Sequence, residues 1–227
     1  MAKRPLYLPG TKGDSLVDSL ELEFKWIAGM AKSQKQKSIR SLHEAAERRN
    51  VSNVLEISSK SENPLGVQLS AFNLLLTTPG GLKTPVENAF QASKVFQFGG
   101  PYLDLLQVTA REAKVDPRLS TSGSLVGFSF EGEDWPTRPL TAFYDWLYVS
   151  ALLQSPSLAE QLLAYSGFTD IEFNPERSLN CQAASAALFV ALSQRGELDA
   201  VTSSREAFLA RLVRSRSVAS AVQGSLL

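Results

Sequence analysis

Three polar side chains are spaced to meet on one face of a buried helix. Across residues 86–96, Glu87, Gln91 and Lys94 fall within about sixty degrees of one another at helical pitch, because positions i, i+4 and i+7 share a face. Most of the other positions are apolar or small, the reverse of an ordinary surface helix. Buried charges are costly unless they are paired or used. The segment therefore predicts either a catalytic group or a structural ion pair between Glu87 and Lys94.

The chemistry open to these residues is that of carboxylates and an amine. Glu87 and Asp170, brought to one pocket, would suit acid–base cleavage of a glycosidic bond, whose oxocarbenium-like transition state needs a nearby anion. A desolvated Lys94 would have a lowered pKa and would act as a nucleophile on a sugar aldehyde or imine. The chain has no phosphate-binding loop motif, no dinucleotide motif, no zinc-ligand spacing and no serine–histidine–acid set.

The surrounding pattern predicts the elements that must position these residues. Strand candidates are 54–58 and 128–130, with an apolar, extended stretch at 69–76. Helices are expected at 38–49 with Ser38 as N-cap, 86–96, 101–114, 141–154, 158–165, 181–195 with Asn180 as N-cap, and 204–213. Asp170 lies in an extended connection at 168–175. With no internal repeat and no linker, we expect a single, mostly helical α+β domain with a few short strands over residues 1–227.

Composition limits the class of protein. The chain has 227 residues, of which 44% are hydrophobic and 20% charged, as in a soluble globular protein. The single cysteine, Cys181, excludes an intramolecular disulfide and suits a reducing cytosol, and the single histidine, His43, argues against a histidine-rich metal site. His43 itself is expected to be a partly buried helix residue. The N-terminus shows no signal peptide and the longest apolar run, 183–192, is too short for a membrane span, so we expect a cytoplasmic protein.

The densest basic group outside the C-terminal tail is formed by Lys32, Lys35, Lys37 and Arg40. The formal net charge is zero, so any contact with nucleic acid must come from such a local group. The four side chains are either a solvated face or a phosphate-contacting patch.

Several of these residues resemble motifs of a known family. The Glu-x-x-Phe-Gln-Ala-x-Lys pattern of 87–94 resembles the signature helix of the NADAR (NAD- and ADP-ribose-associated) family. The segments at 57–61 and 69–72, and the Asp170…Asn180 pair, are similar to its other elements. The resemblance covers roughly residues 55–192 and leaves 1–37 as an N-terminal extension. The sequence departs from the family pattern at Ala71, where the family has Asn, and at Ile171-Glu172, where it has Trp-Gly.

Segments 34–39 and 169–175 resemble the branch encoded beside DarT-type DNA ADP-ribosyltransferase toxins. That resemblance implies an antitoxin that removes ADP-ribose from guanine bases in DNA by hydrolysing the N-glycosidic bond, with ADP-ribosylated DNA as substrate and a DarT-type toxin as functional partner. It implies no metal, no redox cofactor and no membrane.

The resemblance also implies roles for individual residues. Glu87 would be the leading acid–base residue. Lys94 would form a transient imine with ring-opened ribose or supply positive charge, and Asp170 would hold a ribose hydroxyl or position water. The expected binding residues are hydrogen-bonding side chains, aromatic walls and one pyrophosphate contact, namely Ser70, Asn73, Gln91 and Asn180, Phe72 and Phe90, and Arg118. Lys32, Lys35, Lys37 and Arg40 would contact DNA.

Two other functions remain open at this point. One is a small-molecule N-glycosidase of the riboflavin-pathway type, which would not use the basic group. The other is a non-catalytic antitoxin that masks its toxin, which would tolerate the loss of Glu87 and Lys94.

Overall fold

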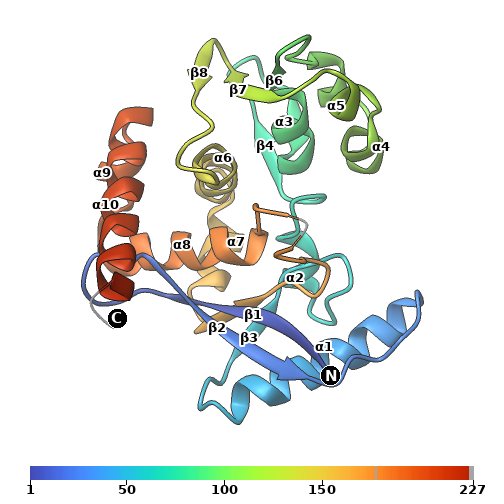
Figure 1. Cartoon of the computed structure of the whole chain (residues 1–227), viewed down its shortest axis with the longest axis vertical. Coiled ribbons are helices and arrows are strands. Elements are labelled where there is room, and N and C mark those ends of the chain that lie inside the picture. Colours follow the sequence, from blue (N-terminus) through green and yellow to red (C-terminus); the bar gives the residue numbers. More distant parts are fainter. Residues whose placement is uncertain (177, 225–227) are drawn as a thin grey trace. The chain divides into compact units, whose positions relative to one another are not determined.

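The chain divides into two compact units. The computed structural model describes residues 1–176 and 178–224 (Figure 1). Residues 71–156 form one unit, here called the inserted unit, and the segments on either side of it form the other, here called the discontinuous unit. The α+β class expected from the sequence is confirmed. The organisation of both units as a single domain stays a prediction.

The discontinuous unit is built on a four-stranded sheet of order β2-β1-β9-β3. Strands β1 (Ala2–Pro9) and β2 (Val17–Phe24) form an antiparallel hairpin. Strand β9 (Gly167–Thr169) pairs antiparallel with β1 and parallel with β3 (Val54–Glu56). The sheet therefore joins segments from both ends of the unit.

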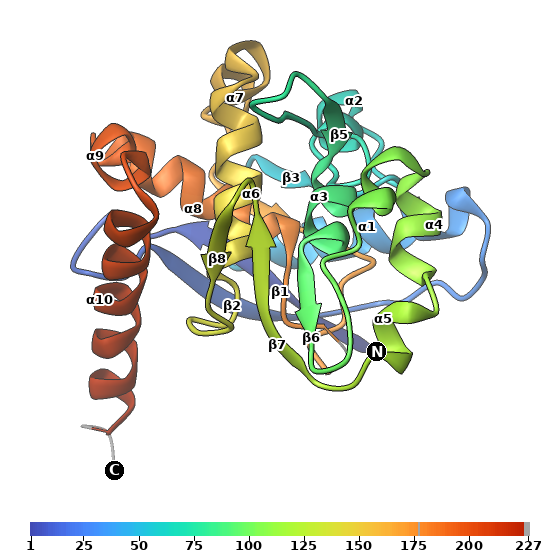
Figure 2. The same ribbon diagram turned by 90° about the horizontal axis from the view of Figure 1, so that it is seen from above.

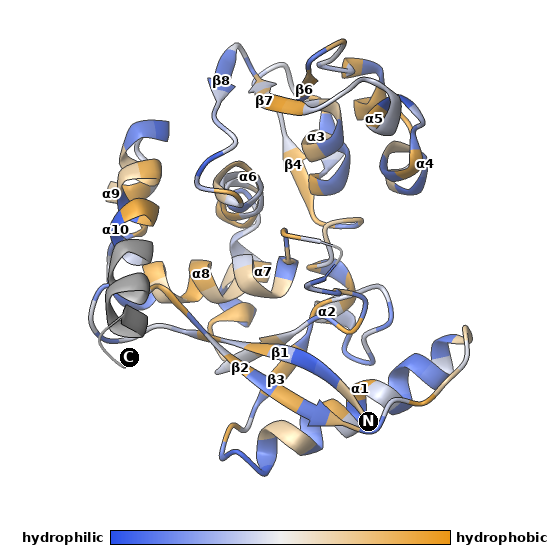
Figure 3. Ribbon diagram, in the orientation of Figure 1, coloured by the Kyte–Doolittle hydropathy of each residue, from blue (hydrophilic) through white to orange (hydrophobic). Residues whose placement is uncertain are grey.

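Helices cover both sides of this sheet, as Figure 1 shows for α1 (Lys32–Glu47) and α8 (Gln182–Gln194). The buried face of α1 packs its Ile39 and Leu42 against Leu6 and Phe24 of the hairpin. Figure 3 shows long hydrophilic stretches on α1 and mostly apolar colouring on α8, whose alanines permit close packing. The other helices of the unit are α2 (Pro64–Gln68), α7 (Pro156–Leu162, starting at the unit boundary), α9 (Leu198–Thr202) and α10 (Arg205–Gly224).

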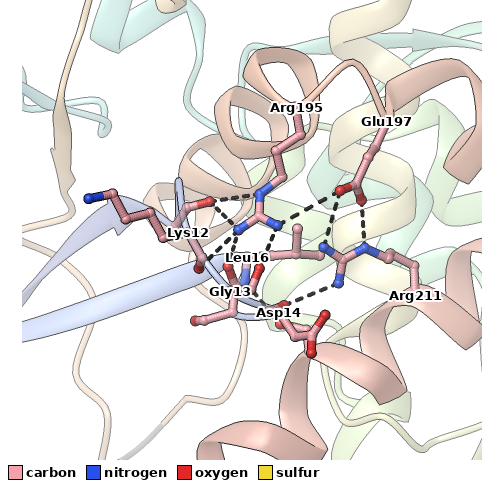
Figure 4. Close-up of polar contacts among 10 residues, drawn as sticks. Lys12, Gly13, Asp14, Leu16, Arg195, Glu197 and Arg211 are labelled. Atoms are coloured by element: carbon pink, nitrogen blue, oxygen red, sulfur yellow. Dashed lines mark hydrogen bonds and ion pairs between the residues drawn. The ribbon is translucent and has the colours of Figure 1, made fainter.

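Two arginines hold the turn between β1 and β2 (Figure 4). The Arg195 guanidinium donates to the backbone carbonyls of Gly10 (2.7 and 2.9 Å), Lys12 (3.4 Å), Gly13 (2.8 Å) and Ser15 (2.7 Å). Arg211 of α10 donates to Glu197 Oε2 (2.6 Å) and to the carbonyl of Asp14 (3.1 Å). Because a turn leaves carbonyls without strand partners, this arginine clamp satisfies acceptors that would otherwise need water.

The inserted unit combines two small sheets with short helices. One sheet pairs β4 (Leu75–Thr77) with β5 (Lys83–Pro85), and the other, seen in Figure 2, has the order β6-β7-β8 with β6 (Lys94–Phe96), β7 (Leu125–Phe130) and β8 (Glu133–Trp135). Its helices are α3 (Val86–Ala92), the 3₁₀ helix η1 (Leu103–Gln107), α4 (Ala110–Val115), α5 (Arg118–Thr121) and α6 (Ala142–Leu153). Phe143 of α6 lies at the centre of an aromatic core and stacks on Phe128 at 4.6 Å between ring centroids.

Several predicted boundaries of helices and strands are wrong. Helix α1 begins at Lys32, and Ser38 lies buried inside it, where its Oγ accepts a hydrogen bond from the amide of Ile27 at 2.9 Å. Only the end of the stretch 69–76 is a strand, from Leu75, because Leu69 caps α2 and residues 70–73 form a bend and a turn. Pro101 does not start one long helix, since η1 and α4 are separate elements. The residue preceding α8 is Cys181, not Asn180.

Candidate functional site

Helix α3 carries an acid and an amide into the interior of the inserted unit. Its first turn has no side-chain cap, and the amides of Val86 and Glu87 instead donate to the carbonyls of Leu74 (3.0 Å) and Ala71 (2.9 Å). Every residue of α3 is buried. An acid in the first turn also faces the positive end of the helix dipole. The sequence therefore predicted the burial of this helix correctly, and its start is fixed by the preceding segment.

Glu87 and Gln91 are joined by one hydrogen bond. Gln91 Nε2 donates to Glu87 Oε1 at 2.9 Å, as expected for side chains four positions apart on a helix. Within the described chain, the buried Gln91 Oε1 accepts no hydrogen bond. A buried acceptor without a donor is costly, and such an atom is suited to receive an N–H or O–H group of a bound molecule.

Lys94 lies on a strand and not on the helix. Helix α3 ends at Ala92, the Ser93 hydroxyl donates to the Ala89 carbonyl at 2.7 Å, and Lys94 begins β6. The prediction that Lys94 shares a helical face with Glu87 and Gln91 is therefore wrong. The physical reason is that Val95 and Phe96 favour an extended chain, and β6 pairs with β7.

The Lys94 ammonium lies over an aromatic ring in a largely desolvated place. Its Nζ is 4.7 Å from the centroid of the Phe90 ring, a cation–π contact. Burial lowers the pKa of Lys94 to about 8, against the opposing field of Glu87, and the charge of Lys114 lowers it further. A lysine with this pKa has a free amine near neutral pH that suits nucleophilic chemistry, while the catalytic role of Lys94 and the role of Phe90 as a wall of the binding site stay predictions.

Lys114 was missed by sequence reasoning. Its Nζ is 3.9 Å from Glu87 Oε1 and 5.0 Å from the centroid of the Phe72 ring, so it brings Phe72 beside the α3 acid. The structural ion pair considered between Glu87 and Lys94 is thus formed by Glu87 with Lys114 instead. Lys114 lies on α4, whose capping box between Thr109 and Glu112 fixes where that helix begins. Nothing in the local pattern marks Lys114 as different from other surface lysines.

Asp170 belongs to the discontinuous unit, directly after β9. Its Oδ1 accepts from the amide of Glu172 (3.0 Å) and its Oδ2 from Gln182 Nε2 (3.0 Å). Burial, and then the field of Glu56, raise the pKa of Asp170 to about 8, so that the carboxyl is largely protonated at neutral pH. Asp170 lies in one unit and Glu87 and Lys94 in the other, and their meeting in one pocket stays a prediction.

The remaining predicted binding residues differ in their surroundings. Ser70 is buried and Asn73 is exposed. Asn180 has a buried Oδ1 that accepts no hydrogen bond in the part of the chain that the structure describes. Arg118 is held by the carboxylates of Asp104 (2.6 Å) and Asp116 (2.9 Å), which raise the pKa of its guanidinium. The two carboxylates take four of the five N–H groups of Arg118, so a pyrophosphate would find one N–H of Nη1 or would displace a carboxylate. The proposed binding roles stay predictions.

The four basic residues divide into two pairs. Lys35 Nζ lies 3.1 Å from Glu172 Oε1 and 4.6 Å from the Trp26 ring centroid, and Arg40 Nη1 lies 2.7 Å from Glu62 Oε1. Lys32 and Lys37 are exposed on α1, and no ion pair to either is found within the described residues. Lys32 and Lys37 therefore offer the more accessible charges for a phosphate backbone.

A cavity of about 330 Å³ lies in the discontinuous unit, between α1, β3 and the segment before α2. Among the predicted site residues only Arg40 lines it, together with His43, Glu44 and Glu56. Burial lowers the pKa of His43 to about 4, which keeps its imidazole neutral. In the described residues, no group of three or more His, Cys, Asp or Glu side chains is placed to hold a metal ion. A search of the described helices finds none that is both long and apolar enough to cross a bilayer.

An α+β fold whose buried helix presents Glu87 and Gln91, followed at once by Lys94, defines a protein of the NADAR class. Comparison with family models gives the particular branch: the model of the DarT1-associated NADAR antitoxin matches residues 2–222, and the chain belongs to this family. The match includes the N-terminal hairpin, which the sequence resemblance had left outside. No curated protein matches the chain.

Proposed function

We propose that the protein removes ADP-ribose from guanine in DNA and so reverses the action of a DarT1-type toxin, acting in the cytoplasm. The observation that carries the proposal is the Lys94 amine, held over the Phe90 ring with a pKa of about 8 on the strand that follows the Glu87 helix. Membership of the DarT1-associated antitoxin family supports the link to a toxin. The identity of the substrate, ADP-ribosylated guanine in DNA, and the hydrolysis of its N-glycosidic bond are both part of the proposal.

In this proposal, Lys94 is the nucleophile and Glu87 transfers the proton. Opening of the ribose ring breaks the bond from the anomeric carbon to the ring oxygen, which takes up a proton, and leaves that carbon doubly bonded to the exocyclic guanine nitrogen. The free amine of Lys94 adds to the anomeric carbon, the bond from that carbon to the guanine nitrogen breaks, and a carbon–nitrogen double bond to Lys94 remains. Glu87 carries a proton to the departing nitrogen, because an amine leaves poorly unless it is protonated. Water then hydrolyses the carbon–nitrogen double bond at Lys94, which releases ADP-ribose and restores the amine.

The other residues of the inserted unit assist substrate binding in this proposal. The open acceptor Gln91 Oε1 takes a hydrogen bond from a ribose hydroxyl or from an N–H group of the base. Phe72 and Phe90 form apolar walls, and Lys114 balances the charge of Glu87. Asp170, largely protonated, donates to the ribose or holds the water.

The deciding experiment incubates the protein with an oligonucleotide that carries ADP-ribosylated guanine and measures free ADP-ribose. We expect release by the wild type and a loss of about a hundredfold or more for Glu87→Gln, which keeps the size of the side chain but cannot carry the proton. Borohydride added during turnover should reduce the imine and leave an ADP-ribosyl adduct on Lys94.

Lys94→Arg tests the role of the amine, and Lys83→Arg, at the exposed first position of strand β5, is its matched control. A guanidinium keeps the charge but is not nucleophilic, so Lys94→Arg should be inactive and give no adduct, whereas Lys83→Arg should behave as the wild type. Partial activity of Lys94→Arg without any adduct in the wild type would limit Lys94 to an electrostatic role. Full protection against toxin by folded Glu87→Gln and Lys94→Arg variants would favour a toxin-masking antitoxin. Cleavage of free ADP-ribosylated metabolites in preference to DNA would favour a small-molecule N-glycosidase.

A further inference from the structure

Glu56 is a buried carboxylate that the proposed reaction does not use. It lies at the end of β3 and is 2% exposed. Its Oε1 accepts hydrogen bonds from the Ser58 hydroxyl (2.7 Å) and from the amide of Ile171 (2.8 Å), and its Oε2 accepts from the Thr169 hydroxyl (2.6 Å). An ionised carboxylate can accept all three hydrogen bonds on its two oxygens, whereas an amide can accept only at its single oxygen.

Two of these donors lie on either side of Asp170 in the chain. Strand β9 ends at Thr169, so the amide of Ile171 has no acceptor on a neighbouring strand and donates to Glu56 Oε1 instead. A buried amide left unpaired here would cost free energy comparable to a lost hydrogen bond. The Asp170 backbone is thus held at its two neighbours by one carboxylate on a different strand.

His43 extends this contact across to α1. Its Nε2 lies 3.0 Å from Thr169 Oγ1. A hydroxyl has one proton, and Thr169 donates it to Glu56, so the hydroxyl must accept from His43 and the neutral ring must carry its proton on Nε2. Burial raises the pKa of Glu56, and the hydrogen bonds from Ile171, Thr169 and Ser58 oppose this rise.

We propose that Glu56 is the positioning residue for Asp170, holding Thr169 and Ile171 so that the Asp170 carboxyl keeps one direction during the reaction. This step rests on the proposed function, in which Asp170 contacts the substrate. Glu56 acts only through its neighbours.

The first test uses the amide of Ile171 as a reporter. Glu56→Ala removes its acceptor, and hydrogen exchange at Ile171 should become about tenfold faster or more, as expected for a lost hydrogen bond to a charged group. Glu56→Gln keeps an oxygen at the position of Oε1 and should preserve the protection. The amide of Phe173, which donates to the Asp170 carbonyl at 3.2 Å, is the internal control for general loosening. Equal exchange at Ile171 in wild type and Glu56→Ala would overturn the proposal.

The second test uses His43, the only histidine of the chain, as a single nuclear magnetic resonance probe. In Glu56→Gln the new NH₂ group donates to Thr169 Oγ1, so the hydroxyl must turn and donate to His43 Nε2. Nitrogen-15 spectra should show the proton on Nε2 in the wild type and on Nδ1 in Glu56→Gln. The same tautomer in both proteins would show that the three side chains are not linked as proposed.

The third test measures whether the two carboxyl groups act together. We expect Glu56→Ala and Asp170→Asn each to lower kcat with little change in KM, and the double variant to be no slower than Asp170→Asn. If the losses in kcat of the two single variants multiply in the double variant, Glu56 acts independently of Asp170 and the positioning role is wrong. An inactive wild type would remove the proposed function, yet the Ile171 and His43 measurements would still decide whether Glu56 holds the Asp170 segment.

Discussion

The lowered pKa of Lys94 leads to a prediction that needs no substrate. With a pKa of about 8, about a quarter of the Lys94 side chains carry a free amine at pH 7.5, against about one in a thousand for a lysine that titrates near 10.5. This is an enrichment of about two hundredfold in the nucleophilic form. It arises because burial penalises the ammonium more than the field of Glu87 stabilises it.

Two substitutions should move this pKa in opposite directions. Glu87→Gln removes the negative charge that favours the ammonium, so the pKa of Lys94 should fall below about 8. Lys114→Met removes a repelling positive charge and should raise it. Lys114→Met also leaves Glu87 without its ion pair at 3.9 Å, which strengthens the attraction between Glu87 and Lys94 and adds to the same shift.

Nuclear magnetic resonance titration can measure these values directly. Reductive methylation with carbon-13 formaldehyde labels each lysine, and the signal of Lys94 is assigned by its absence in Lys94→Arg. Exposed Lys32 and Lys37 serve as reference groups in the same spectrum. A Lys94 pKa within half a unit of these two lysines would refute the desolvation argument, and so would shifts of the same sign in Glu87→Gln and Lys114→Met.

Three further predictions concern other parts of the chain. The pKa of His43 is about 4 in the folded protein and about 6.5 in the unfolded chain, so the unfolded state takes up a proton first as the pH falls. Urea titrations should therefore show that the wild type loses about 2 kcal/mol of unfolding free energy between pH 7.5 and pH 5 relative to His43→Gln. Replacing Lys32 and Lys37 by alanine should weaken binding of modified oligonucleotide and reduce the slope of log affinity against log salt by about two. Lys35→Ala should also slow cleavage of ADP-ribosylated guanosine, because the amide of its partner Glu172 donates a hydrogen bond to Asp170, and unchanged cleavage of this nucleoside would refute the distinction. Arg195→Met should lower the free energy of unfolding by about 2–4 kcal/mol because it leaves turn carbonyls without donors, and a loss below about 0.5 kcal/mol would show that water replaces them readily.

The buried helix was predictable because its signal is local. The spacing of Glu87, Phe90 and Gln91 indicates burial within seven residues of sequence, and α3 confirms it. Lys94 was placed on the same helix because the apolar period continues through Phe96. What ends the helix is pairing of β6 with β7, about thirty residues further along the chain, and single-sequence periodicity does not contain that information.

The surroundings of Asp170 were not predictable for a related reason. Glu56 is an ordinary member of a short strand until β3 pairs with β9, which brings Thr169 and Ile171 to its carboxylate across more than a hundred positions. The same holds for Ser38, a good N-cap by type, which a contact with Ile27 places inside α1 instead. The preference of a residue type for a cap or a strand predicts its position poorly where long-range hydrogen bonds stabilise a different one.

The arginine clamp on the β1–β2 turn sets an order of events during protein synthesis. The turn at Gly10 is synthesised before its donor, Arg195, which lies 185 positions later in the chain. The hairpin can form early from local pairing, whereas its turn carbonyls stay hydrated until α8 has emerged. The inserted unit is continuous and is complete before that moment. We therefore expect nascent chains to carry a complete α3–β6 segment before Arg195 binds the turn carbonyls of the β1–β2 hairpin.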